Sequence, residues 1–157
     1  MIGEGVRVEK NPSETRKVGQ AAVTYTPNLN HTSVGVMMEE VYRRGEVTTN
    51  LEFSFGFEGR EPARPKQVSW AFLADWNLFR SGAPLVVEVD GRRFSFRPER
   101  DMSMPGQHVG QMDFATFERV ANSKRARLSV GRVAFILSES QREALRDMLK
   151  ALETPAK

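Results

Sequence analysis

The chain has no cysteine, and its 157 residues include only two histidines and two tryptophans. The absence of cysteine excludes disulfide frameworks, zinc sites with cysteine ligands, iron–sulfur clusters and thiol nucleophiles. It does not indicate a compartment, because cytosolic proteins and the mature parts of exported proteins can both lack cysteine. The location of the protein therefore stays open between the cytoplasm and an exported, mature form.

Long hydrophobic runs are also missing, so the sequence predicts no membrane span. Residues 1–5 have neither the basic segment nor the apolar segment of a signal peptide. A length of 157 residues suits one core. We expect residues 1–157 to form a single domain, with residues 1–19 as a flexible N-terminal arm.

Motifs that carry catalysis are absent as well. The sequence has no Gly-x-Ser-x-Gly elbow and no glycine-rich phosphate loop. His31 and His108 lie in separate turn-like stretches without a second metal ligand nearby, so a metal site would need the fold to bring both together. We expect no catalytic residue, no metal and no cofactor, and we predict that the protein is not an enzyme.

A long alternation of apolar and polar residues is the most informative pattern that the chain does contain. Its apolar positions are Val47, Thr49, Leu51, Phe53, Phe55 and Phe57. Because side chains of a strand point to opposite faces with a period of two, this segment has one apolar face and one polar face. Such a half-buried strand is typical of an antiparallel sheet with one packed side and one solvated side.

Further strands are indicated along the whole chain. They cover residues 21–26, 32–42, 67–74, 85–89, 92–96, 107–112, 127–130 and 133–137. Residues 37–44 also fit a helical turn, and residues 67–74 also fit a helical face, although their strand-rich neighbourhood favours a strand. Asp90-Gly91 between two β-rich runs predicts a two-residue type I′ turn, because both positions need a positive φ.

Two helices are predicted near the C-terminus. Asp113 can cap a short helix over residues 113–122, with Asn122 in a left-handed conformation at its end. Ser138 and Gln141 form a capping box that opens a second helix, from residue 139 to about residue 153. The predicted fold class is therefore α+β. It is mainly antiparallel β, sandwich-like or a strongly curved sheet, with the short helix and the C-terminal helix packed on it.

One stretch of the chain resembles known sequences. Residues 117–124, Gly131 and residues 137–145 resemble the C-terminal end of small, uncharacterised bacterial β-rich modules. In those modules a helix, a short hairpin and a capped helix follow a β-rich body. The resemblance covers roughly the last 45 residues on this pattern, implies a bacterial α+β domain, and attaches no function.

Positive charge is the best functional hint. The net charge is +3, and residues 115–157 hold nine Lys and Arg against five Asp and Glu. Two hairpin regions carry the candidate polyanion-binding residues Arg92, Arg93, Arg97, Arg100, Lys124, Arg125, Arg127 and Arg132. Phe94 and Phe96 interleave with this set, but their shared parity predicts that both face the core while Arg93 and Arg97 face solvent.

We favour a non-catalytic interaction or structural module, whose partner is another protein or a second copy bound through a sheet face or an exposed strand edge. The alternative is nucleic-acid or polyanion binding through the basic hairpins. A further alternative is a carrier in which Phe and Trp residues line a cavity for a small apolar ligand. Met37-Met38 fits an adaptable binding surface, although filling of a core is the preferred interpretation.

Overall fold

The protein is described by a computed structural model that covers residues 12–74, 82–99 and 107–153. Strand β4 (Val47–Glu58) is the predicted alternating segment. Thr49, Leu51, Phe53, Phe55 and Phe57 are buried, whereas the residues between them are partly or fully exposed. The half-buried strand that the alternation predicted is therefore confirmed.

A six-stranded antiparallel sheet contains β4. Its order is β1-β2-β3-β4-β5-β8, with strands β1 (Glu14–Val18), β2 (Ala21–Thr26), β3 (His31–Arg44), β5 (Gln67–Ala74) and β8 (Gln107–Asp113). A short 3-10 turn, η1 (Pro27–Leu29), joins β2 to β3. The first five strands pair with their neighbours in sequence, and β8 then adds to β5 after the chain has formed two strands elsewhere.

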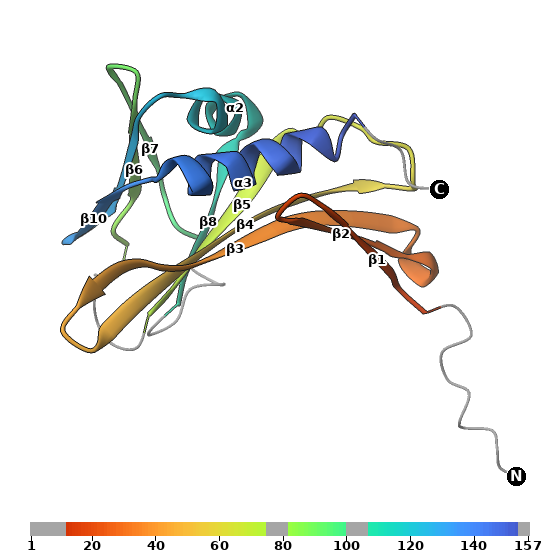
Figure 1. Cartoon of the computed structure of the whole chain (residues 1–157), viewed down its shortest axis with the longest axis horizontal. Helices are drawn as coiled ribbons and strands as arrows, with labels where there is room; N and C mark the ends of the chain where they lie inside the picture. The colour runs from red at the N-terminus through yellow and green to blue at the C-terminus, as the bar shows by residue number, and fades with distance from the viewer. Residues whose placement is uncertain (1–11, 75–81, 100–106, 154–157) are drawn as a thin grey trace, which may run out of the picture.

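Those two strands belong to a second, four-stranded antiparallel sheet of order β10-β9-β6-β7. Its strands are β6 (Leu85–Val89), β7 (Arg92–Phe96), β9 (Ala126–Val130) and β10 (Val133–Ile136). The two sheets are tied together just after β7, where Pro98 forms a β-bridge with Gly110 and the Glu99 N–H donates to the Val109 carbonyl at 2.7 Å. Figure 1 shows the small sheet standing at one end of the large sheet.

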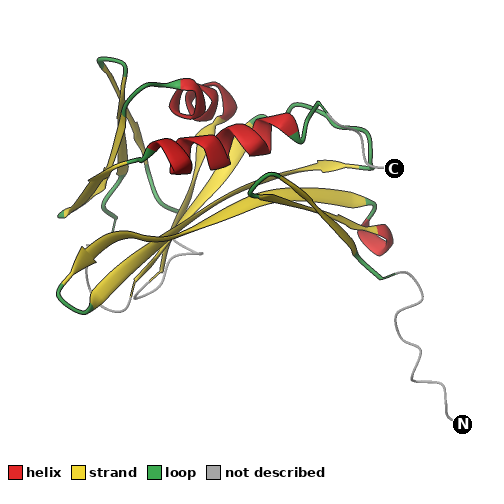
Figure 2. Cartoon of the chain, in the orientation of Figure 1, coloured by secondary structure: helices red, strands yellow, loops and turns green. Residues whose placement is uncertain are grey.

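Both helices lie on the same face of the large sheet (Figures 1 and 2). Helix α2 (Phe114–Asn122) packs over β5 and β8, and helix α3 (Glu139–Lys150) packs over β1, β2 and β3. The fold is therefore α+β with mainly antiparallel strands and two helices, as the sequence predicted. The C-terminal helix ends three residues earlier than expected, and a turn follows it to residue 153.

Aromatic side chains fill the space between β4 and α2. The ring centroid of Phe117 lies 5.7 Å from that of Phe53 and 6.3 Å from that of Phe55. Phe114 adds an edge-to-face contact with Phe55 at 5.9 Å. Full burial of one such side chain stabilises a fold by about 1.5–3 kcal/mol, so the Phe residues of β4 are a principal source of stability.

The helical alternative for residues 37–44 is wrong, because β3 continues as a strand to Arg44. Met38 pairs with Leu51 and Tyr42 pairs with Thr49, so three residues of β3 oppose one residue of β4. Glu40 takes a positive φ of 47° inside this bulge. The bulge interrupts the two-residue period of the strand, and this is why the pattern there resembles a helix.

The two helix starts agree with the sequence, whereas one predicted helix end does not. Asp113 caps α2 by accepting a hydrogen bond from the Thr116 N–H, and Ser138 and Gln141 form both bonds of the capping box. The expected left-handed end at Asn122 is wrong, since Asn122 lies inside α2 and the cap is Ser123 in an extended conformation. The Ser123 hydroxyl donates to the Val120 carbonyl at 2.8 Å, which satisfies an acceptor at the helix end.

Part of the segment that we expected to be a flexible arm is an edge strand, since Glu14–Val18 pair with β2. Arg60, in the loop after β4, donates two hydrogen bonds of 2.9 Å to the Glu14 carboxylate. Its guanidinium also lies 3.9 Å above the ring of Tyr25. These contacts hold the edge strand β1 against the loop that follows β4.

Candidate binding surfaces

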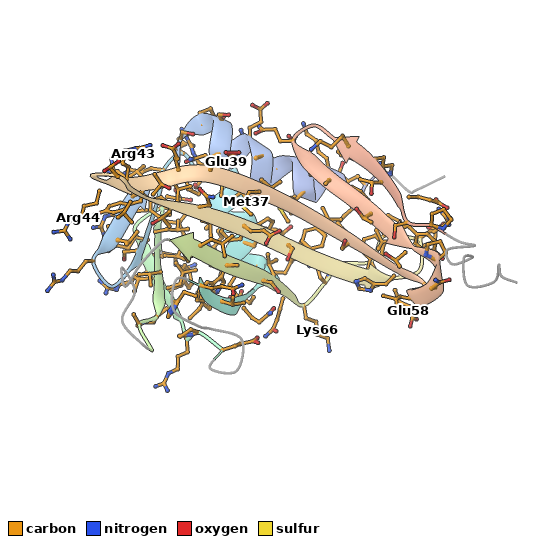
Figure 3. The ribbon with its side chains drawn as sticks, turned by 90° about the horizontal axis from the view of Figure 1, so that it is seen from below. Met37, Glu39, Arg43, Arg44, Glu58 and Lys66 are labelled. Atoms are coloured by element: carbon orange, nitrogen blue, oxygen red, sulfur yellow. The ribbon has the colours of Figure 1, made fainter. Side chains whose placement is uncertain are left out.

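The face of the six-stranded sheet that points away from both helices is here called the open face (Figure 3). Its side chains come from the exposed parity of each strand. Small ones occupy the central rows: Ala22, Thr24, Ser33, Gly35, Ser54, Gly56, Ser69 and Ala71. Larger ones of the same parity are Lys17, His31, Met37, Asn50, Glu52, Glu58, Gln67, Leu73, Gln107, Val109 and Gln111. Neither described helix covers this surface. It is therefore a broad sheet surface with small side chains in its central rows and larger polar side chains around them.

Met37 is the large apolar side chain that projects from the open face, with 45% of its surface exposed. Its register partner is Glu52, which is followed across the sheet by Ala71 and Val109. Met38 is only 5% exposed and belongs to the core. Met37 therefore fits the interpretation as a binding surface and Met38 the interpretation as core filling, because neighbouring residues on a strand point to opposite faces.

Polar side chains on the open face hydrogen bond to one another across neighbouring strands. The hydroxyls of Thr15 and Thr24 are 3.1 Å apart, and the Gln111 amide donates to the Ser69 hydroxyl at 2.7 Å. Polar groups that already have partners lose less on being covered than groups that depend on water. Contact with another surface would therefore carry a modest desolvation cost at these positions.

The candidate basic residues do not form one continuous patch. Five of them gather where the Asp90-Gly91 turn lies beside the chain that enters β9, and we call this group the basic end: Arg92, Arg93, Lys124, Arg125 and Arg127. Arg97 follows the last residue of β7, and Arg132 lies in the turn after β9. Both are therefore at the other end of the small sheet, away from the Asp90-Gly91 turn. A five-residue strand separates the two groups, which corresponds to about 16 Å. Arg100 lies outside the described residues.

Glu88 lies between two of the candidate cations, a relationship that the sequence analysis missed. It pairs in register with Arg93 on one side and with Arg127 on the other. Its carboxylate is 3.1 Å from the Arg127 guanidinium and 3.7 Å from that of Arg93. All three side chains are substantially exposed, so each pair adds little stability, but the carboxylate offsets part of the positive charge.

A surface hollow of about 280 Å³ lies at the basic end. Lys124, Arg125 and Arg127 line one side, and Glu88 and the Asp90-Gly91 turn line the other. The lining combines three cations with two carboxylates. The hollow is therefore basic at its rim without being uniformly positive.

The interleaved aromatics do not form an exposed platform for stacking bases. Phe94 and Phe96 are partly buried and pack against the core, whereas Arg93 and Arg97, one on each side of them, are exposed. The parity prediction for these four positions is confirmed. Binding of a nucleic acid by stacking of its bases would require aromatic side chains that are exposed to solvent, which Phe94 and Phe96 are not.

His31 and His108 lie on opposite sides of the same sheet. His31 is exposed at the start of β3 and lies across Gly56, whereas His108 is buried and its Nε2 atom is 2.6 Å from the Ala83 carbonyl oxygen. Among the described residues, no group of three or more His, Asp or Glu side chains is arranged to hold a metal ion. The fold therefore does not bring the two histidines together.

Aromatic residues that the carrier hypothesis placed around a cavity pack against one another. The ring centroid of Phe72 is 5.9 Å from that of Trp70 and 6.1 Å from that of Phe135. A larger hollow of about 480 Å³ lies at the surface between α2, the end of α3 and the loop after β4. There Arg64 lies 4.5 Å above the Phe114 ring and donates to both carboxylate oxygens of Glu118, so the lining combines charged side chains with apolar ones. Trp76 lies outside the described residues.

Comparison of the chain with protein-family models, with curated proteins and with solved structures finds no match. The resemblance of the C-terminal stretch to bacterial β-rich modules therefore stays a prediction. In the part of the chain that the structure describes, no helix combines the length and the apolar composition needed to cross a bilayer.

Proposed function

We propose that the protein is a non-catalytic interaction module that associates with a second copy of itself through the open face. One observation carries this proposal: both helices pack on one side of the six-stranded sheet, and the exposed Met37 projects from the other. Large exposed sheet faces with an apolar centre and a polar surround are typical of interaction surfaces. The bacterial origin implied by the C-terminal resemblance is likewise a proposal.

The size of the open face supports a contact between two folded copies. Six strands about 4.8 Å apart, with eight residues of about 3.3 Å along β3, give a surface of roughly 600 Å². A standard interface buries about 800 Å² on each partner. The open face and a few surrounding side chains therefore approach the area that a stable dimer needs.

The chemistry of the open face also fits a copy of itself. The small side chains of its central rows allow two sheets to approach closely there, and Met37 can adapt its shape to the opposing surface. Lys17 and Glu52 place charges of both signs on the same surface. In a two-fold contact, where the same patch meets itself, such a surface can avoid placing like charges together.

A face contact is favoured over pairing along the β1 edge. That strand has only five residues, and its side chains include Glu14, Arg16 and Lys17. Short, charged edge strands are a common protection against the addition of another strand. The open face also carries charge, since Glu52 is the register partner of Met37, but it spans six strands rather than one short edge.

The test is the oligomeric state, measured by light scattering after size exclusion over a wide range of protein concentration. We expect the mass to rise toward that of a dimer with concentration, and Met37→Glu to weaken the association at least about tenfold, because it buries a charge at the centre of the contact. Ile136→Glu is the matched control, since Ile136 is a strand residue with 48% exposure on the small sheet.

The Ile136→Glu variant should associate as the original chain does. A chain that stays monomeric throughout, or equal weakening by both variants, would overturn the proposal. Arg125→Glu, at the basic end, should leave the association unchanged and thereby separate this surface from the one discussed next.

A further inference from the structure

We infer that the basic end of the small sheet binds the phosphodiester backbone of nucleic acid without reading its sequence. This inference does not depend on the proposed self-association, because the basic end and the open face belong to different sheets. It concerns the positions and partners of five cations, four of which are arginines.

Three of these cations have no acidic partner within the described residues. Arg92, Lys124 and Arg125 are exposed, and they form no ion pair with a described carboxylate. Arg127 and Arg93 share the single carboxylate of Glu88. The basic end therefore has more guanidinium and ammonium donors than nearby acids can satisfy, and a ligand with several negative charges can use the remainder.

Lys124 and Arg125 are held on a short link with two fixed ends. Before them, Ser123 is buried, its hydroxyl donates to the Val120 carbonyl, and its own carbonyl accepts a 2.6 Å bond from Arg142. After them, Ala126 is fully buried and its carbonyl accepts a hydrogen bond from the Leu137 N–H at 3.0 Å. A rigid link lowers the conformational entropy that is lost when the two cations bind a ligand.

The opposite rim of the hollow is equally constrained. Asp90 and Gly91 have positive φ angles of 49° and 78°, which define the tight turn between β6 and β7. Arg92 follows this turn directly but does not line the hollow, because it pairs with the buried Val89, whereas Arg93 and Arg127 pair with Glu88. The cations of the hollow therefore lie on the side of Lys124, Arg125 and Arg127, opposite a fixed turn.

Arginine is well suited to phosphate, because its planar guanidinium can donate two parallel hydrogen bonds to phosphate oxygens as it does to carboxylate oxygens. Glu88 and Asp90 line the hollow and repel an anion that enters it. We therefore expect the backbone to pass along the side of the hollow that Lys124, Arg125 and Arg127 line, with contacts to about three phosphates. Phe94 and Phe96 face the core, so contact is limited to the backbone and the sequence of bases is not read.

The test measures fluorescence anisotropy of a labelled single-stranded DNA of random sequence and of the matching duplex. We expect binding at low salt, and an affinity for the single strand that falls with a slope of about −2 in log–log form for three phosphate contacts. The variant Lys124→Glu/Arg125→Glu should lose at least about tenfold in affinity.

The matched control is Arg97→Glu/Arg132→Glu. It makes the same change in net charge at the end of the small sheet that lies away from the basic end. It should weaken binding much less, and both double variants should keep the circular dichroism spectrum of the original chain. Equal loss in the two double variants would assign binding to net charge alone and overturn the inference. Absence of binding at low salt, or equally effective competition by polyglutamate, would also overturn it.

Discussion

The buried carboxylate of Asp147, on helix α3, accepts a hydrogen bond from the backbone N–H of Gln20, with 2.8 Å between Oδ2 and N. This bond fastens the C-terminal helix to the turn between the first two strands, across 127 positions of sequence. Gly19, just before Gln20, makes the approach possible. It has a φ of 59°, and a Cβ atom there would lie 2.3 Å from Asp147 Oδ2.

Gly19→Ala should therefore destabilise the fold for two reasons. The positive φ costs about 1 kcal/mol for alanine, and displacement of the Asp147 carboxylate costs a further 1–3 kcal/mol, roughly, through the lost hydrogen bond. Gly45→Ala is the control, because Gly45 has a φ of 64° and nothing within 4 Å of the added Cβ. Urea denaturation should show a clearly lower midpoint for Gly19→Ala. Similar midpoints for the two variants would contradict the close contact with Asp147.

Gly110→Ala should be strongly destabilising because of Trp70. A Cβ at Gly110 would lie 2.3 Å from the Cζ2 atom of the Trp70 ring, and this ring is fully buried. Overpacking of a filled core typically costs about 1–3 kcal/mol. Gly35→Ala is the control, since its nearest neighbour would be a carbonyl oxygen at 3.4 Å. Thermal unfolding that gives the same midpoint for both variants would show that the Trp70 ring can move aside.

The carboxyl group of Glu14 should titrate below the ordinary glutamate range. Hydrogen bonds from the Arg60 side chain are the main cause that lowers the pKa of Glu14, although partial burial acts in the opposite direction. The folded-state pKa is depressed, so the pair stabilises the fold above the ordinary pKa, and this contribution is lost as the pH falls through the folded-state value.

This pKa can be followed by carbon NMR of the side-chain carboxyl during a pH titration. Arg60→Gln should raise the pKa of Glu14 toward its ordinary value, because the donor charge is removed. Arg43→Gln should not change it, since Arg43 pairs with Glu40 instead. A Glu14 pKa that does not respond to Arg60→Gln would contradict the bidentate contact in solution.

Glu88→Gln should strengthen the binding of nucleic acid. The substitution removes the carboxylate that Arg127 and Arg93 share, so both guanidinium groups become available to phosphate. For one additional phosphate contact, the log–log slope of single-strand affinity against salt should become steeper by about 0.7. Glu58→Gln makes the same charge change at the end of β4 and should have little effect. Equal gains in both variants would point to net charge rather than to these two arginines.

Local patterns predicted most of the strands and both helix starts. The alternation that begins at Val47 and the Asp90-Gly91 turn depend on residues next to each other in sequence, so they can be recognised without the fold. The bulge after Met38 could not be predicted in this way. It depends on the register with Leu51 and Thr49, and on the Asn50 side chain, which accepts a hydrogen bond from the Glu40 N–H at 2.9 Å.

The candidate surfaces were only partly predictable for the same reason. The eight basic residues could be identified from their positions, but the division of the seven described ones into two groups depends on the pairing of β6 with β9, which lie far apart in sequence. That pairing also places Glu88 beside Arg127. The open face could be inferred only once both helices were known to pack on the same side of the sheet.

The tie between the two sheets at Pro98 and Glu99 also limits how the outer edge of β8 can pair with a strand from another chain. This segment occupies the outer side of β8 near Val109 and Gly110, where an unpaired strand would otherwise offer a template to other chains. Proline has no N–H group to donate, so ladder growth beyond this point is interrupted. Edge-to-edge pairing of β8 with strands of other copies is therefore opposed along this part of the strand. A face-to-face contact through the open face does not use this edge.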